Sequence, residues 1–225
     1  MRKFLSTIFM FLSIVSFASA EIKEGREYEV LPFVVKNAEN SLIKVSRYNC
    51  PFCYKYDELF MDKVMINLPE FNYMPYHSAV GASFGKYASK VLSVMIAKDM
   101  EDGVSLVDEK SSYHRTIMAI YTAYHKENER WGNNANDDKN VEKFLKTALK
   151  PTGMSIDEYE KRLQNSNTVE ILNAWGLDES GMAANLAEIQ GVPSFIVNGK
   201  YLIKYQAIKT PTQLAELIKE VSNLD

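Results

Sequence analysis

The sequence predicts an α/β fold in which a large all-helical domain is inserted into a smaller domain that contains a β-sheet. Three observations predict it. Residues 41–48 and 71–76 are rich in apolar and β-favouring side chains, so each is expected to form a strand. Residues 84–190 then repeat their apolar side chains at helical spacing. Residues 195–203 have the pattern of a β-hairpin with Asn-Gly at its turn, and a helix follows.

The first twenty residues have the pattern of a cleaved secretory signal peptide. Arg2 and Lys3 precede an apolar run over residues 4–17, and Ala-Ser-Ala at 18–20 supplies the small residues of a cleavage site. The alternative is an uncleaved membrane anchor, but the run is shorter than the roughly 20 residues of a spanning helix. Cleavage changes the net charge from −3 to −5, because residues 1–20 carry two basic residues and no acidic one.

The composition excludes two broad classes of protein. Hydrophobic residues make up 46% of the chain, which is enough for a core and excludes bulk disorder. The mild negative charge argues against nucleic acid as the main partner. After the signal peptide no stretch has the length of a membrane span, so we expect the mature chain to be soluble.

We divide the mature chain into three segments. Residues 21–82 form the first part of the sheet domain, 83–190 the inserted helical domain and 191–225 the second part of the sheet domain. Within the insertion, the polar residues 133–140 are expected to be an exposed loop. Before the last helix, Thr210 is placed to cap the N-terminus, with Pro at the next position.

The two cysteines of the chain, Cys50 and Cys53, form a Cys-x-x-Cys pair. The strand before them is broken by Asn49, and Pro51 suits the first turn of a helix. Free backbone N–H groups and the helix dipole would stabilise a thiolate at that end. We therefore expect Cys50 to be the nucleophile and Cys53 the shielded, resolving thiol. The apolar face of this helix is expected to continue through Tyr56, Leu59, Phe60 and Val64.

Two other interpretations of the pair are weaker. A structural disulfide closing so short a loop would stabilise the fold by only about 2 kcal/mol. A zinc site needs about four ligands, and the three histidines show no ligand spacing with the cysteines, so we expect no metal. We expect those histidines to be surface or core residues rather than catalysts, namely His77, His114 and His125.

A second element accompanies the cysteines. Val192 and Pro193 directly precede the hairpin, where a proline is ordinarily a turn or edge feature. In thioredoxin-like proteins a cis-proline stands before this strand and faces the Cys pair, with neighbouring backbone free to pair with an extended substrate. Because the segment from Gly191 to Phe195 resembles that element, we expect a cis bond before Pro193.

These motifs together resemble the DsbA family of thiol:disulfide oxidoreductases over essentially the whole mature chain. Phe52, where DsbA itself carries a histidine, places the resemblance closest to the DsbL branch. The segments that carry it are Leu42 to Val45, Cys50 to Asp57, Ala123 to His125, Glu129 to Trp131, Ile189 to Pro193 and Val197 to Tyr201.

The resemblance implies a monomeric periplasmic oxidase with a thioredoxin-like fold and a large inserted all-helical domain. It implies no cofactor, exported clients with reduced cysteines, and reoxidation by an inner-membrane quinone reductase of the DsbB or DsbI type. An arylsulfate sulfotransferase is the client associated with DsbL. The rival readings are a reductase or isomerase of the same fold, or a binding chaperone. The implied site residues are Cys50 and Cys53 (catalytic), Pro51 and Phe52 (modulating), and Val192 and Pro193 (substrate-binding).

One departure from the family concerns a buried carboxylate near the resolving cysteine. Our alignment places Pro32 where the family usually has a glutamate. Such a carboxylate can carry the proton of the resolving thiol. Either that role is dispensable here, or a nearby residue such as Glu27 or Glu29 takes it. Phe52 is the second departure from DsbA, since it cannot stabilise a thiolate by charge.

Basic residues occur in the segments that we expect around the site, although the chain is acidic overall. A positive field there would replace the charge of the missing histidine and favour acidic clients. The alternative is an ordinary mixed surface. The residues concerned are Arg47, Lys55, Lys86, Lys90, Lys200 and Lys204.

Overall fold

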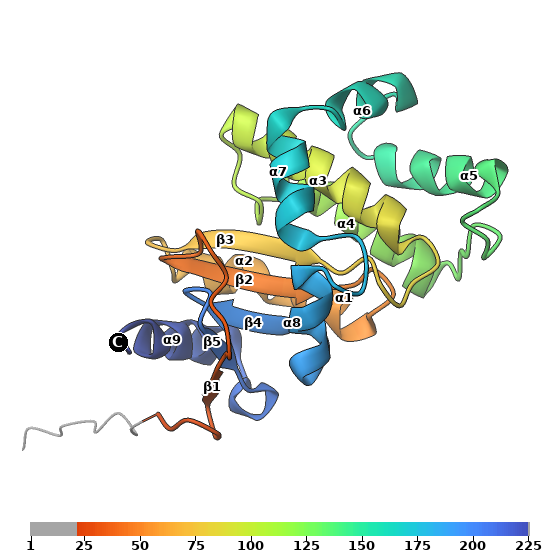
Figure 1. The fold of residues 1–225 in the computed structure, drawn as a ribbon. Coiled ribbons are helices and arrows are strands. Elements are labelled where there is room, and N and C mark those ends of the chain that lie inside the picture. Colours follow the sequence, from red (N-terminus) through yellow and green to blue (C-terminus); the bar gives the residue numbers. More distant parts are fainter. Residues whose placement is uncertain (1–21, 225) are drawn as a thin grey trace, which may run out of the picture.

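The computed structural model describes residues 22–224. The predicted signal peptide therefore lies outside the described residues. Over the described part of the chain, none of the helices combines the length and apolar character that crossing a bilayer requires. Along the chain, two strands, two short helices and a third strand are followed by the helical block, and then by a hairpin and a closing helix (Figure 1).

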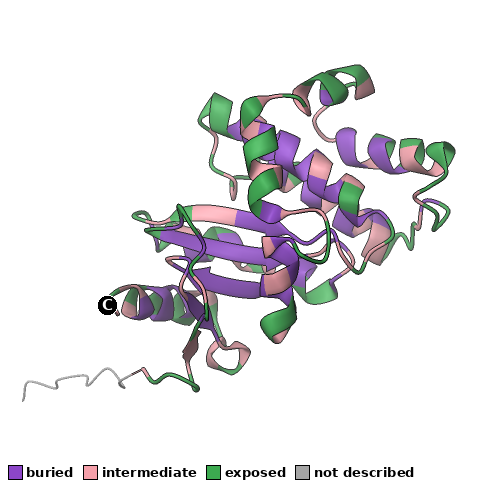
Figure 2. Cartoon of the chain, in the orientation of Figure 1, coloured by how far each residue is buried: buried purple, intermediate pink, exposed green. Residues whose placement is uncertain are grey.

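One five-stranded mixed sheet forms the centre of the molecule. The strand order is β1-β5-β4-β2-β3; β2 and β3 are parallel, and the other pairs are antiparallel. The inner strand β2 is buried along its whole length, and Figure 2 shows it in the colour of buried residues. The strands are β1 (Tyr28–Val30), β2 (Ser41–Ser46), β3 (Asn72–His77), β4 (Ser194–Val197) and β5 (Tyr201–Ile203).

Helices cover both faces of this sheet. One hydrophobic cluster joins the sheet to α2 and α9, and the other joins it to the helical block. α8 contacts both α7 and the strands β2 and β4 (Figure 1). The helices are α1 (Pro51–Leu59), α2 (Met61–Ile66), α3 (Gly85–Asp102), α4 (Ser112–Tyr121), the π-helix η1 (Thr122–Lys126), α5 (Asp138–Leu149), α6 (Ile156–Arg162), α7 (Ser166–Trp175), α8 (Met182–Gln190), the 3-10 helix η2 (Tyr205–Ala207) and α9 (Pro211–Ser222).

The local signals of the hairpin and of the last helix are confirmed. Asn198 and Gly199 have φ angles of 53° and 64°, as a type I′ turn requires. Gly199 is needed for a second reason, because a Cβ there would lie 2.5 Å from the carbonyl oxygen of Val35. Thr210 caps α9 by accepting a hydrogen bond from the N–H of Gln213.

Strand β3 runs through its proline instead of being interrupted by it. Pro75 pairs with Lys44 in the register of β2 and β3. β3 is an edge strand, so one side of its backbone has no neighbouring strand, and the N–H that proline lacks is not needed there.

The predicted apolar face of the first helix is confirmed only in part, because Tyr56 and Val64 pack in one hydrophobic cluster but the helix is broken between them. The helix ends at Leu59, Phe60 adopts a non-helical conformation, and α2 begins a residue later. Helical spacing cannot be counted across that break. Leu59, at the end of α1, does not join the apolar face and is 49% exposed. Another difference lies in the segment 133–140, where the polar loop is shorter than expected because α5 begins at Asp138.

Candidate active site

Cys50 lies at the N-cap position of α1, and three residues separate it from the end of the inner strand β2. Its backbone is extended, with φ −91° and ψ 114°, and Pro51 occupies the first turn of the helix as predicted. The Cys50 Sγ accepts a hydrogen bond from the backbone N–H of Cys53 at 3.1 Å. Both thiols are free; 9% of Cys50 is exposed, and Cys53 is fully buried. Both cysteines are therefore buried, and Cys53, one turn into the helix, is the more shielded of the two, as expected.

The surroundings shift the pKa values of the two thiols in opposite directions. The hydrogen bond with Cys53 is the largest cause that lowers the pKa of Cys50, to about 7; the backbone N–H groups of Cys53 and Phe52 and the charge of Lys44 add to it. Desolvation raises the pKa of Cys53 well above its usual range. The direction for Cys50 agrees with the expectation that the N-terminus of the helix stabilises a thiolate.

The cis-proline loop meets Cys50. The Val192–Pro193 peptide bond is cis, as predicted. The Cys50 thiol donates a hydrogen bond to the carbonyl oxygen of Val192 at 3.3 Å. Two segments 142 residues apart in the sequence thus come together at one sulfur atom.

Phe52 carries no charge and points away from the core. Its side chain is 63% exposed, so its contribution to the thiolate comes through the backbone N–H alone.

Two of the three histidines contact the backbone of Tyr48, two residues before Cys50. His77 is buried, and its Nε2 accepts the N–H of Tyr48 at 3.1 Å. A ring nitrogen of His125 lies 3.0 Å from the carbonyl oxygen of Tyr48.

A buried ion pair lies under the cysteines, and the sequence analysis did not identify it. Lys44 on β2 and Asp57 on α1 are 2.5 Å apart, with side-chain exposures of 1% and 4%. The hydroxyl of Tyr121 donates a hydrogen bond to the same carboxylate at 3.1 Å. Asp57 follows Cys53 by four residues, so both face the same side of α1. That spacing was the signal available in the sequence.

Neither of the two glutamates named as candidates supplies a buried carboxylate. Pro32 is exposed and lies in the segment after β1. Glu27 pairs with Arg26 and accepts a hydrogen bond from the backbone N–H of Lys23, and Glu29 is half exposed and pairs with Lys204. The buried carboxylate that lies on the helix of the cysteines is Asp57 instead.

Of the basic residues that could form a positive field around the site, not all lie near the cysteines. Lys200 follows the hairpin turn, whose Asn198 bonds to Ser41 at the start of β2, whereas Cys50 follows the end of β2. At about 3.3 Å per residue, the strand alone separates these ends by about 16 Å. The charge of Lys204 is paired with Glu29. Lys55 lies exposed on α1 beside the pair, and Lys86 lies at the start of α3.

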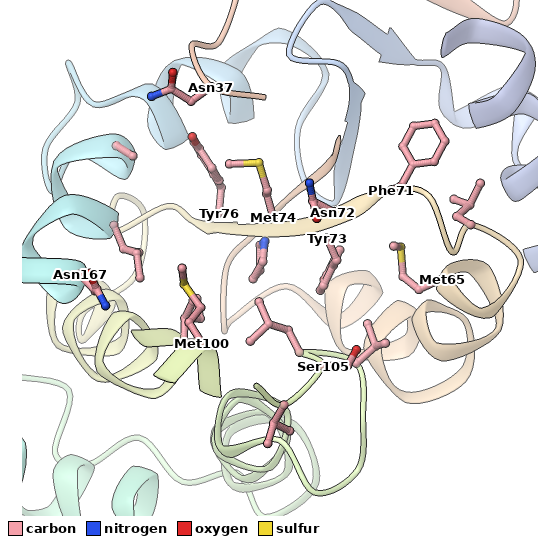
Figure 3. Close-up of a pocket in the computed structure, with 18 of the residues that line it drawn as sticks. Asn37, Met65, Phe71, Asn72, Tyr73, Met74, Tyr76, Met100, Ser105 and Asn167 are labelled. Carbon is pink, nitrogen blue, oxygen red and sulfur yellow. The ribbon is translucent and has the colours of Figure 1, made fainter. Parts of the chain in front are cut away.

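An apolar groove of about 750 Å³ opens along the edge strand β3. It lies between that strand, α2, α3 and α7, and Figure 3 shows three methionines around it, Met65, Met74 and Met100. Neither cysteine and no residue of the cis-proline loop lines this groove. It is therefore separate from the site around Cys50.

No family model matches the chain. The thiol:disulfide interchange protein DsbL of Escherichia coli O6:H1 (strain CFT073) is 39% identical over 210 residues, covering 93% of this chain and 90% of that protein. The crystal structure of DsbL from Salmonella enterica serovar Typhimurium has a TM-score of 0.84 at 38% identity, covering 92% of this chain and 100% of that one. The thiol:disulfide interchange protein DsbA of Yersinia pestis is 27% identical over 199 residues, covering 87% of this chain and 83% of that protein.

The sheet with its helical insertion and the Cys-x-x-Cys pair at a helix start define a disulfide oxidoreductase with a thioredoxin-like fold. The predicted fold class is thereby confirmed. The chain belongs to the DsbA family, in its DsbL branch.

Proposed function

We propose that the protein is a periplasmic thiol oxidase that donates a Cys50–Cys53 disulfide to exported proteins with reduced cysteines. One observation carries the chemistry: Cys50 has a lowered pKa at a helix N-terminus, and Cys53 beside it has a raised one. At pH 7 a thiol with a pKa of about 7 is about half thiolate, whereas a free cysteine is a few per cent thiolate.

The transfer takes two exchange steps. A client thiolate attacks Cys50 Sγ of the disulfide; the Cys50–Cys53 bond breaks, a mixed disulfide forms, and Cys53 takes up a proton. The client's second thiolate then attacks the client sulfur of the mixed disulfide, and Cys50 leaves as a thiolate. The client loses two electrons and the protein gains them, so no cofactor takes part.

Four further residues act around this exchange. Pro51 fixes the first helical turn, and Phe52 supplies a backbone N–H and an exposed apolar ring beside the sulfur. Val192 and Pro193 provide the backbone along which an extended client segment pairs. Their support is the contact between the Val192 carbonyl and the Cys50 thiol.

The setting and the partners extend this proposal. Residues 1–20 direct export and are removed, so the mature monomer acts in the periplasm. A quinone-linked inner-membrane protein of the DsbB or DsbI type reoxidises the pair. The resemblance to DsbL supports an arylsulfate sulfotransferase as client. Its reduced form should then be oxidised faster than an unrelated reduced protein of similar size, and equal rates would remove that assignment.

The reduction potential of the pair decides between an oxidase and a reductase. Equilibration with glutathione buffers should give a value near the about −120 mV of DsbA. A value near the about −270 mV of thioredoxin would make the protein a reductase. The redox-inactive Cys50→Ser, Cys53→Ser variant is the matched control for signals that do not come from the pair.

A further inference from the structure

A second, smaller hollow lies directly beside the cysteine turn. Its volume is about 200 Å³, which suits a single side chain. Asn49, the residue before Cys50, forms part of its wall, and none of the described residues that line it is acidic. The main lining residues are Tyr48, Asn49, Ser83, Tyr124, Arg130 and Asn133.

The guanidinium of Arg130 is the charged group of this hollow. It lies 3.8 Å from the centre of the Tyr124 ring. One nitrogen, Nη1, donates hydrogen bonds to the carbonyl oxygens of Tyr124 and Glu129 at 2.7 and 2.8 Å. An arginine has five N–H donors, so the donors on Nε and Nη2 remain. Among residues 22–224, Arg130 forms no ion pair.

The adjacent carboxylate is already engaged. The Glu129 side chain accepts the backbone N–H groups of Arg130 and Trp131 at 2.8 and 2.5 Å. It is therefore held against its own backbone and leaves the guanidinium without a carboxylate. A second cation lies beside the lining residue Gly81, since a Cβ there would lie 3.3 Å from Nη1 of Arg47, although Arg47 itself does not line the hollow.

The segment that carries Arg130 is held in place by its neighbour. Trp131 has a φ angle of 48°, which is unusual for so large a residue. Its ring is 1% exposed, packs against Phe144 at 4.9 Å, and donates a hydrogen bond to Thr147 at 3.1 Å. A fixed guanidinium loses little freedom when it binds a planar anion, so the hollow is prepared for one.

We propose that this hollow is a subsite for a client carboxylate, which Arg130 binds when an acidic side chain lies close in sequence to the client cysteine. The inference rests on the proposed oxidase function and names the client feature that it selects. Consecutive residues of an extended peptide advance by about 3.3 Å. When the client cysteine is at Cys50, an acidic residue one to three positions away in the client therefore extends past Asn49 to the hollow.

Paired peptides test the proposal. Each peptide carries two cysteines and either Glu or Gln, placed one, two or three residues before or after the first cysteine. The rate of oxidation by the disulfide form of the protein is measured for each. We expect Glu to be preferred about tenfold in at least one register, the effect of one partly exposed charge-assisted contact of about 1.4 kcal/mol.

Variants of the protein assign the preference to the hollow. Arg130→Gln should bring the Glu to Gln ratio close to one, and Arg130→Lys should restore part of it. Arg115→Gln is the matched control: Arg115 is exposed on α4 and bonds to the carbonyl oxygen of Pro151, so the ratio should stay at the wild-type value. Equal rates in all registers of the wild type, or an unchanged ratio in Arg130→Gln, would overturn the proposal.

Binding of the same peptides with both cysteines replaced by serine gives an independent readout. The dissociation constants should show the same Glu to Gln ratio and the same loss in Arg130→Gln. If no peptide is oxidised, the proposed function fails, whereas this binding ratio still decides the subsite. A binding ratio of one in every register would overturn the subsite even when oxidation proceeds.

Discussion

The buried pair of Lys44 and Asp57 supports a prediction about stability that can be worked from its geometry. The two groups are 2.5 Å apart, and both side chains are almost completely buried. Among the described residues, Nζ of Lys44 has no hydrogen-bond partner beyond this ion pair. Lys44→Met leaves a buried carboxylate without its cation, and Asp57→Leu leaves a buried ammonium without its anion. Each single variant should lose about 3 to 5 kcal/mol in the free energy of unfolding.

The double variant is the informative one. With both charges replaced by apolar groups of similar volume, the desolvation cost disappears together with the attraction, so the double variant should be close to the wild type or more stable. Urea unfolding of the reduced protein measures all four members of the cycle. Single losses below about 1 kcal/mol, typical of exposed pairs, would refute the reasoning. So would a double variant that loses the sum of the two.

Four further predictions follow from the same site. The thiolate absorbance of the reduced protein should titrate with a midpoint at or below about pH 7. A midpoint near about 8.5, the pKa of a free cysteine, would contradict Cys50 as the nucleophile. The variant Cys53→Ser should trap mixed disulfides through Cys50. The free energy of unfolding of the reduced protein should rise between about pH 7 and 8.5, because Cys50 has lost its proton there in the folded protein but not in the unfolded chain. It should fall above about pH 8.5, because Cys53 keeps a proton in the folded protein that the unfolded chain releases. The oxidised protein has no thiols and should show neither slope. Lys55→Glu should raise the pKa of Cys50 and slow client oxidation in low salt. Lys200→Glu should do neither, because Lys200 lies farther from Cys50 than a Debye length of about 8 Å. Equal effects of the two variants would contradict the placement of the two lysines. Burial lowers the pKa of His77 to about 3, so below about pH 6.5 the unfolded chain binds a proton at His77 that the folded protein does not bind. The free energy of unfolding should therefore fall as the pH drops below about 6.5. A free energy of unfolding that stays constant from pH 6.5 to 5.5 would refute this.

The fold and the reactive pair could be predicted because their signals are local. Asn198 and Gly199 form the turn that their dipeptide indicates, and Cys50 caps the helix whose first turn contains Pro51. These signals depend on neighbours in the chain, which the sequence displays directly.

The missed features depend on pairing between distant segments. Lys44 stands in an apolar strand, and only the packing of α1 on that strand supplies its partner Asp57. Lys200 is only three residues beyond the end of β4, the strand that follows Pro193, yet that strand carries it to the opposite end of the sheet from the cysteines. Arg130 gives no signal by spacing, because the loop of Trp131 brings it to Asn49 from 81 residues away.

The hydrogen bond from the Cys50 thiol to the Val192 carbonyl has a consequence for the order of events. It needs the sulfur's proton, so it exists only in the neutral form of the thiol. When Cys50 ionises, the carbonyl loses its donor and faces a negative sulfur atom instead. A peptide N–H then becomes the natural replacement for the lost proton. The Cys50 sulfur also has no proton in the disulfide, so in the form that meets a client under the proposed function the Val192 carbonyl has no thiol donor and is free to accept a peptide N–H.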